Sequence, residues 1–251
     1  MCGIIGFTGR KPAKDILIDG LERLEYRGYD SAGIALLNDD DTLTIRKKAG
    51  RVSELRELCK DGEYSSTCGI GHTRWATHGG VTDANAHPHR CGNVALIHNG
   101  IIENYSDIIR EYGLADKLVS ETDSEVVAAL LDTLYEGDPI TAIQKVVKII
   151  AGSFALCIMF ADRPGIIYAV RNVSPMVAAH SEEGSIIASD LTAIISFSKD
   201  YFVVPEYHIL TMTEGGIKVE DLKGNEVRPQ MLEITWDITA AQKGGFPHFM
   251  L

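Results

Sequence analysis

The residues at the very start of the chain, Met1-Cys2-Gly3, have the types needed for nucleophilic chemistry. Initiator methionine is generally removed when the second residue is small, so we expect Cys2 to become the first residue. Cys2 would then carry both a thiol, with an ordinary pKa of about 8.5, and an α-amine, with an ordinary pKa of about 7.7–8.0. A weak nucleophile needs a base within reach, and here one residue would supply both. Taken alone, a cysteine at position two is more often incidental, so its interpretation depends on the residues that follow.

The tripeptide His98-Asn99-Gly100 follows the apolar run 94–97 and could stabilise a developing negative charge. The side-chain amide of Asn99 and the backbone N–H of Gly100 can converge on one oxygen, and glycine permits close approach. The alternative is structural, because Asn-Gly between apolar runs is the typical sequence of a tight hairpin turn. On local grounds the pattern favours the turn.

The segment 71–80, GHTRWATHGG, offers groups that could anchor a substrate. Arg74 has a planar fork of donors that matches a carboxylate. Thr77 and His78 add further donors, and the glycine pair at 79–80 would let the segment move as a lid over the site. The alternative for this segment is a surface arginine beside a packed Trp75.

Asp123 in the segment 121–125 could pair with a substrate ammonium. A carboxylate in the first turn of a helix also complements the helix dipole, and both interpretations can hold together. A carboxylate partner and an ammonium partner together describe a zwitterionic amino acid as substrate. Arg27, in the segment EYRGYDSAG at 25–33, could lie near the N-terminus and orient the thiol, although its spacing alone is a weak signal.

The elements that must position these residues follow from hydrophobic periodicity and from helix-end residues. Thr122 and Glu125 form a capping-box pattern, Asp138-Pro139 is typical of a helix start, and Gly113 is typical of a helix end. We predict helices at 13–24, 103–112, 122–135, 140–150 and, more briefly, 190–196. We predict strands at 4–8, 32–37, 43–47, 68–73, 94–98, 154–160, 166–171, 176–180, 185–188, 201–204, 208–213 and 217–219.

The order of these elements predicts the fold class. Strands come in hairpin-like runs and helices in pairs, without regular strand–helix alternation. This order indicates an α+β domain with mainly antiparallel sheets and helices on their outer faces. The chain has neither a Gly-x-Gly-x-x-Gly nor a Walker sequence, which argues against dinucleotide and ATP chemistry.

Composition restricts the class of protein further. The 251 residues, 45% hydrophobic and 24% charged, are typical of a soluble globular protein of one large or two small domains. A net charge of −11 argues against nucleic acid or an anionic membrane as partner. The five cysteines are scattered and form no CxxC pair, as expected in a reducing compartment. No leader or membrane-spanning run is found in the sequence, so we expect a cytoplasmic location.

Six sequence blocks, in order along the chain, carry a family resemblance: CGIIGF, EYRGYDSAG, GHTRWATHG, NAHPH, HNGIIEN and SETDSEV. Together they resemble the glutaminase half of the glutamine–fructose-6-phosphate aminotransferases, class II glutamine amidotransferases of the N-terminal-nucleophile hydrolase superfamily. The resemblance implies a four-layer αββα sandwich with two mainly antiparallel sheets. It implies hydrolysis of L-glutamine to glutamate and ammonia through a γ-glutamyl thioester, without a cofactor or metal.

The resemblance also implies roles for individual residues. Cys2 matches the nucleophile, Asn99 and Gly100 match the oxyanion hole, and Arg27 matches a position near the nucleophile. The glutamine-binding positions are matched by Arg74, Trp75, Thr77, His78 and Asp123.

Members of this family continue into two sugar-isomerase domains that bind fructose 6-phosphate and make glucosamine 6-phosphate. We therefore expect residues 1–240 to be the glutaminase domain and residues 241–251 to begin the connector to isomerase domains that this chain lacks. The full-length enzyme is expected to be a homo-oligomer. The blocks resemble the sugar-phosphate enzyme more than other class II amidotransferases, which remain the alternative.

Two other functions are compatible with parts of the sequence. Five histidines lie close together along the chain, and histidine is the commonest metal ligand: His72, His78, His87, His89 and His98. A metal-dependent hydrolase is therefore an alternative, although HExxH is absent and carboxylates are sparse in that stretch. A catalytically silent binding module is a third possibility, which predicts that Cys2 does not react with a glutamine-like electrophile.

Overall fold

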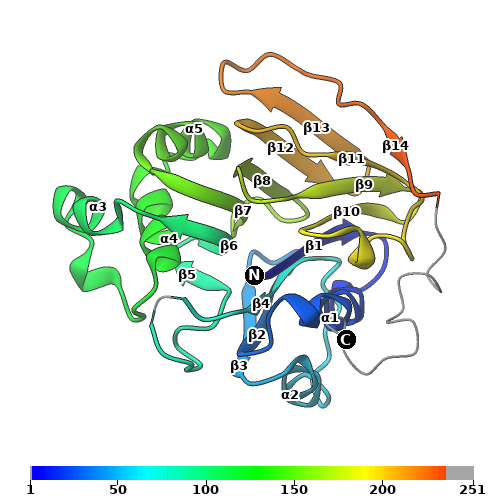
Figure 1. Ribbon diagram of the computed structural model, residues 1–251, viewed down its shortest axis with the longest axis horizontal. Coiled ribbons are helices and arrows are strands. Elements are labelled where there is room, and N and C mark those ends of the chain that lie inside the picture. Colours follow the sequence, from blue (N-terminus) through cyan, green and yellow to red (C-terminus); the bar gives the residue numbers. More distant parts are fainter. Residues whose placement is uncertain (1, 78, 236–251) are drawn as a thin grey trace.

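The computed structural model describes residues 2–77 and 79–235 as two β-sheets stacked face to face, with helices on both outer sides (Figure 1). His78 and the connector predicted at 241–251 lie outside the described residues. No helix in the described part of the chain is both long enough and apolar enough to cross a membrane.

The first sheet has eight strands: β1 (Gly3–Gly9), β2 (Ser31–Leu37), β3 (Leu43–Ala49), β4 (Cys68–Arg74), β9 (Val177–Ser181), β10 (Gly184–Ala188), β11 (Asp200–Val203) and β14 (Leu232–Glu233). Their order across the sheet is β14-β11-β9-β10-β1-β4-β2-β3, and neighbouring strands are antiparallel. Strand β1, which begins directly after Cys2, is therefore an inner strand.

The second sheet has six strands: β5 (His89–Cys91), β6 (Val94–Ile102), β7 (Gly152–Phe160), β8 (Ile167–Asn172), β12 (His208–Thr213) and β13 (Gly216–Asp221). Their order is β13-β12-β8-β7-β6-β5, again antiparallel throughout. The helices are α1 (Ala13–Leu24), α2 (Val52–Leu58), α3 (Tyr105–Tyr112), α4 (Asp123–Leu134) and α5 (Pro139–Ile149).

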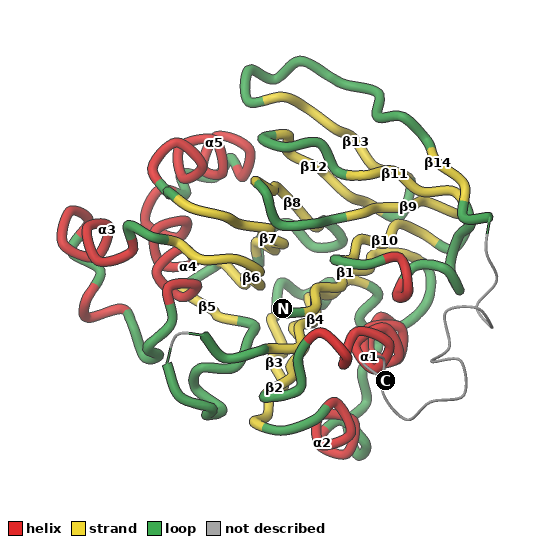
Figure 2. Tube along the Cα trace, viewed as in Figure 1, coloured by secondary structure: helices red, strands yellow, loops and turns green. Residues whose placement is uncertain are grey.

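Side-chain alternation along the strands fills three separate apolar layers. In β1, Ile4 faces the second sheet while Ile5 and Phe7 pack beneath α1 and α2. In β6, Ile97 faces the first sheet while Leu96 packs against α4 and α5. Successive residues of a strand point to opposite faces, so each sheet presents apolar side chains on both of its faces. Both faces of each sheet are therefore buried. Helices cover both outer faces (Figure 2), and the predicted four-layer α+β architecture is confirmed.

The helix-end signals act as predicted, with one difference. Gly113 ends α3 in the left-handed region at φ 62°, and Asp138 accepts a hydrogen bond from the Ile140 amide at the start of α5. The Thr122 side chain accepts from the Glu125 amide, as in a capping box. The Glu125 carboxylate, however, accepts from the amides of residues 119 and 120 rather than from Thr122. The Glu125 carboxylate therefore holds residues 119 and 120 of the preceding loop against the start of α4.

Two predictions about local structure are wrong. Asn99-Gly100 is not a hairpin turn: β6 continues through both residues to Ile102, and Gly100 lies opposite Phe154 of β7. The helix predicted at 190–196 is only a 3₁₀ turn over Leu191–Ala193. The helix α2 and the short strands β5 and β14 are not predicted, because none of them is long enough to show a clear hydrophobic period.

Candidate active site

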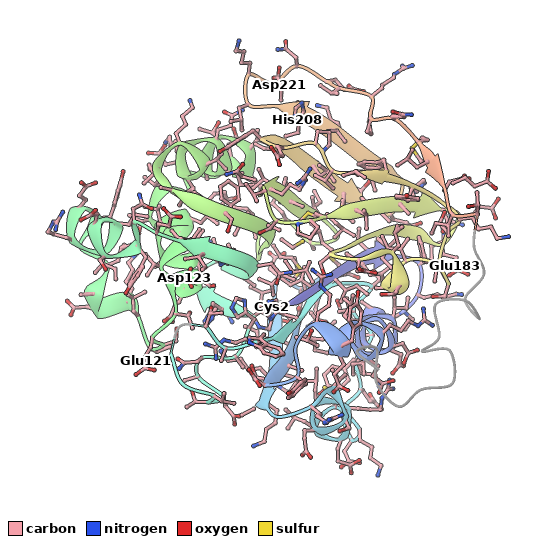
Figure 3. The ribbon with its side chains drawn as sticks, in the orientation of Figure 1. Cys2, Glu121, Asp123, Glu183, His208 and Asp221 are labelled. Atoms are coloured by element: carbon pink, nitrogen blue, oxygen red, sulfur yellow. The ribbon has the colours of Figure 1, made fainter. Side chains whose placement is uncertain are left out.

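Cys2 directly precedes β1 and lies near the centre of the view, with Asp123 of α4 to its left (Figure 3). Its sulfur accepts a hydrogen bond from the backbone amide of Trp75, with an N–S distance of 3.3 Å. Burial raises the pKa of the Cys2 thiol, and this effect is opposed by the Trp75 N–H and by the positive charges of Arg74 and Arg27. The raised pKa means that a base must take the thiol proton before the sulfur can act as a nucleophile at neutral pH.

The backbone of Cys2 is held by two side chains. Its carbonyl oxygen accepts hydrogen bonds from Arg27 Nε at 3.1 Å and from Asn99 Nδ2 at 3.0 Å. Arg27 is in turn paired with Asp190, at 3.4 Å. Arg27 therefore lies close to the residue that carries the thiol and contacts it through the backbone.

Gly28, directly after Arg27, lets this segment approach the Arg74–Trp75 peptide closely. A Cβ atom at Gly28 would lie 2.8 Å from both the Arg74 carbonyl carbon and the Trp75 amide nitrogen. No side chain fits at that distance, so Gly28 packs its backbone directly against the Arg74–Trp75 peptide that donates to the sulfur.

Asn99 and Gly100 reach this region from the second sheet. Gly100 has a φ of 131°, and a Cβ there would lie 2.0 Å from the carbonyl oxygen of Ser153 in β7. Only glycine can adopt this conformation with the neighbouring strand so close. The glycine of the Asn-Gly pair is therefore required by an unusual backbone conformation inside a sheet, beside the thiol. The pair resembles a turn only in its local sequence.

A small cleft lies beside the thiol. Six of the predicted residues line it: Cys2, Arg74, Trp75, Thr77, Gly100 and Asp123. Asn99 and Arg27 reach the same place through their bonds to the Cys2 carbonyl. The cleft is also lined by His87, His98, Thr122 and Ser124, which the sequence does not assign to a substrate site. Thr122 and Ser124 flank Asp123 in the sequence, so the first turn of α4 is the signal that could have identified them.

Arg74 is not a surface arginine, because only 4% of its area is exposed. Its guanidinium donates to the carbonyls of Gly80, at 3.0 Å, and Gly79, at 3.4 Å. Burial lowers the pKa of Arg74, while the nearby Cys2, Asp30 and Asp123 oppose that effect. A buried cation that bonds the 79–80 backbone can hold a substrate carboxylate and the loop above it together.

Trp75 is 46% exposed and makes an edge contact with Tyr29 at 5.8 Å between ring centroids. It is therefore not packed in the core, and its side chain can cover the cleft. Asp123 is buried, and its Oδ2 atom accepts from the Ile102 amide at 2.7 Å. Its Oδ1 atom is 3.4 Å from the Ser124 hydroxyl, so the carboxylate is held in place at the N-terminus of α4, where the helix dipole also favours it.

Four histidines form a buried group next to the cleft, and two of them, His87 and His98, line it. His72 stacks on His87 with ring centroids 4.1 Å apart, and His89 packs edge-on against His87 at 4.6 Å. His98 Nδ1 lies 2.8 Å from the Ser124 hydroxyl, and His89 Nε2 lies 3.0 Å from that of Thr122. Burial lowers the pKa of all four, to about 3 for His72. These rings are neutral packing and hydrogen-bonding groups, and in the described residues no set of three or more His, Cys, Asp or Glu could hold a metal ion.

A thiol, amide donors, a buried cation and a held carboxylate around one cleft, on stacked antiparallel sheets, define a nucleophilic amide-cleaving enzyme of the N-terminal-nucleophile type. Residues 72–196 match the family model described as glutamine amidotransferase domain, and the chain belongs to this class II glutamine amidotransferase family.

The chain is also similar to curated proteins along its whole length. The chain is 42% identical over 255 residues to glutamine–fructose-6-phosphate aminotransferase of Clostridium tetani, and 42% identical over 254 residues to that of Thermus thermophilus. Each match covers 100% of this chain and 42% of the relative. The chain therefore spans less than half the length of these relatives.

Solved structures share the fold. The glutamine phosphoribosylpyrophosphate amidotransferase of B. subtilis, complexed with ADP and GMP, superposes with a TM-score of 0.76 at 25% identity, covering 90% of this chain and 50% of that one. A glutamine aminotransferase class-II domain protein from Silicibacter pomeroyi, at 12% identity, superposes with a TM-score of 0.60 over 88% of this chain and 99% of that one. The second comparison concerns the fold alone.

Proposed function

We propose that this chain hydrolyses the side-chain amide of L-glutamine to glutamate and ammonia, with Cys2 as the nucleophile. The observation that carries the proposal is the convergence of the Cys2 sulfur, Arg74 and Asp123 on one cleft. An electrophilic carbonyl placed at the sulfur would leave the α-carboxylate and α-ammonium of an amino acid within the same cleft. Membership of the glutamine amidotransferase family supports glutamine as that amino acid.

We assign substrate recognition to residues that line the same cleft as the thiol. Arg74 binds the glutamine α-carboxylate through its planar fork, and Asp123 pairs with the α-ammonium. Thr77 lines the cleft beside Arg74 and supplies a further donor, a role that we extend to His78 from its sequence position. Trp75, exposed at the cleft, covers the bound amino acid.

The first half of the reaction forms the thioester. After removal of Met1, the α-amine of Cys2 takes the thiol proton, directly or through one water molecule. The thiolate attacks the side-chain carbonyl, and the resulting oxyanion is stabilised by Asn99 Nδ2 and the Gly100 amide. The ammonium group then returns its proton to the departing nitrogen, which leaves as ammonia, and a γ-glutamyl thioester remains on Cys2.

The second half repeats these steps with water as the nucleophile. The same α-amine takes a proton from water as it attacks the thioester carbonyl, and the oxyanion again forms at Asn99 and Gly100. Collapse of this intermediate breaks the C–S bond and releases glutamate, and the proton returns to the sulfur. Arg27 acts throughout by holding the Cys2 backbone.

We further propose that the whole protein uses this ammonia to make glucosamine 6-phosphate from fructose 6-phosphate. The identity to glutamine–fructose-6-phosphate aminotransferases along the entire chain supports this assignment. In this proposal residues 1–240 are the glutaminase domain, residues 241–251 begin the connector, and the sugar-isomerase domains and a homo-oligomeric, cytoplasmic state belong to the full-length enzyme.

The proposed function is tested by assaying the purified chain for glutamate release from glutamine and by intact mass spectrometry before and after treatment with a glutamine-like electrophile. We expect glutamate release, loss of the Met1 mass, and one adduct that peptide mapping places on Cys2. A chain that releases no glutamate and takes up no electrophile would contradict the proposal. Excess free glutamine should slow the labelling, because both compounds compete for the cleft.

Arg74→Ala provides a separate test of substrate recognition. We expect KM for glutamine to rise by about 10- to 100-fold, because a charge-assisted bidentate contact is lost, while kcat changes less. Initial rates over a range of glutamine concentrations measure both constants, with Arg90→Ala, an exposed arginine in β5, as the control. An unchanged KM in Arg74→Ala would contradict the carboxylate-binding role.

A further inference from the structure

The Asn99 side chain lies between two hydrogen-bonding partners that select opposite ends of its amide. Its Nδ2 atom donates to the Cys2 carbonyl at 3.0 Å, and its Oδ1 atom is 3.0 Å from Nε2 of His72. An asparagine amide has nearly the same shape when rotated by 180°, so its orientation depends on its partners. The two contacts together place the NH2 group on the side of the nucleophile.

The surroundings of His72 define its protonation state. Its Nε2 atom lies between two acceptors, Asn99 Oδ1 and the His98 carbonyl oxygen, at 3.0 and 3.1 Å. An acceptor pair requires a hydrogen on Nε2. On the other side of the ring, Nδ1 is buried and has no hydrogen-bond partner in the described part of the chain. Burial keeps the ring neutral, with a pKa of about 3, so the ring is the tautomer with hydrogen on Nε2 only.

The ring has little freedom to change this arrangement. His72 is 1% exposed, belongs to the inner strand β4 and stacks on His87 at an interplanar angle of 15°. The strand also pairs with β1 in a register that sets His72 opposite Ile4, two residues after the nucleophile. One strand therefore positions both the N–H donor for Asn99 and, at its end, Arg74.

We propose that His72 is a positioning residue for glutamine hydrolysis, whose Nε2–H holds the Asn99 amide with its NH2 group toward the reacting carbonyl. This inference rests on the proposed function. If the amide rotated, its oxygen would face the developing oxyanion and repel it, so the donor would be lost and replaced by an unfavourable charge. His72 does not itself line the cleft, and its proposed effect on the reaction is exerted through its hydrogen bond to Asn99.

The test compares His72→Phe with His72→Gln. Phenylalanine keeps a ring that can stack on His87 but removes the N–H, and we expect kcat to fall by about 10- to 100-fold with KM changed less than about threefold. Glutamine can place an amide N–H near the position of Nε2, and we expect it to recover at least about half of the lost activity on a logarithmic scale. Thermal unfolding of each variant separates a loss of fold from a loss of orientation.

A double-mutant cycle shows whether His72 acts through Asn99. In the Asn99→Ala background the positioned amide is absent, so adding His72→Phe is expected to change kcat by less than about twofold. A further loss as large as that in the parent protein would overturn the proposal. So would a His72→Phe variant with the parent kcat.

A readout without turnover separates this inference from the proposed function. In the ¹⁵N NMR spectrum of histidine-labelled protein at pH 7, we expect His72, assigned by its absence from His72→Gln, to be neutral with hydrogen on Nε2. A neutral ring with hydrogen on Nδ1, or an imidazolium, would overturn the positioning role even if the chain hydrolyses glutamine. A parent chain that releases no glutamate but shows this tautomer would contradict the glutaminase assignment and leave the donor geometry standing.

Discussion

Replacing Cys2 with alanine is expected to lower kcat for glutamine hydrolysis by about 10⁴-fold or more, to the limit of detection. Removal of a nucleophile costs on the order of 10⁶-fold in a well-studied serine protease, where the residual rate comes from binding and from the oxyanion hole. Here the thioester cannot form without the sulfur, so no equivalent route remains. Glutamate release, followed by a coupled assay at saturating glutamine, measures the loss.

The Cys2 variant should still fold and bind glutamine. The sulfur makes only long hydrogen bonds, accepting from the Trp75 amide at 3.3 Å and donating to the Trp75 carbonyl at 3.6 Å, and Cys2 is only partly buried. Calorimetric titration with glutamine should therefore give a dissociation constant within a few-fold of the parent KM. Cys91→Ala is the matched control, since that sulfur is also partly buried but contacts Asp132 away from the cleft. Glutaminase activity of Cys2→Ala above about 1% of the parent value would refute the nucleophile assignment.

Replacing Asn99 with alanine is expected to lower kcat by about 10²- to 10³-fold, the usual effect of removing one oxyanion-hole donor. KM should change little, because the Asn99 amide stabilises charge that develops only in the transition state. Part of the loss also comes from the Cys2 carbonyl, which loses one of its two side-chain donors but keeps Arg27. Steady-state kinetics of the variant measures both constants.

Asn172→Ala is the matched control for Asn99→Ala. Asn172 lies in β8 and also donates its amide to a backbone carbonyl, that of Gly152, at 3.0 Å, but it does not line the cleft. The Asn172→Ala variant should lose about as much free energy of unfolding as one side-chain-to-backbone hydrogen bond contributes. Its kcat should be unchanged. Normal turnover by Asn99→Ala would contradict the oxyanion assignment, and a kcat loss of the same size in Asn172→Ala would indicate a general effect of weakening the second sheet.

Local structure is predicted well wherever its cause lies within a few residues. Helix α1 spans Ala13–Leu24 as predicted, because its apolar spacing and the flanking residues are sufficient. Gly113 and Asp138 end and begin helices through bonds to near neighbours in the chain. Thr122 acts as an N-cap for the same reason.

Predictions fail where the deciding contact comes from a distant part of the chain. Asn99-Gly100 has the local chemistry of a turn, and only the neighbouring strand β7 shows why glycine is required there, since a Cβ atom at Gly100 would lie 2.0 Å from the Ser153 carbonyl oxygen. Arg74 has the local sequence of a surface residue, and its burial follows from the pairing of β4 with β1 and β2.

The amino-acid order is enough to indicate the α+β class, a candidate nucleophile and candidate residues for holding an amino acid, since residue types and short-range spacing carry that information. It cannot indicate that His72, a candidate metal ligand by its sequence position, donates to Asn99 instead. That contact joins β4 of one sheet to β6 of the other. The contact exists only when the two sheets are stacked, because a hydrogen bond of about 3 Å requires the two side chains to be on faces that pack together. The local sequence of either strand does not indicate which faces pack.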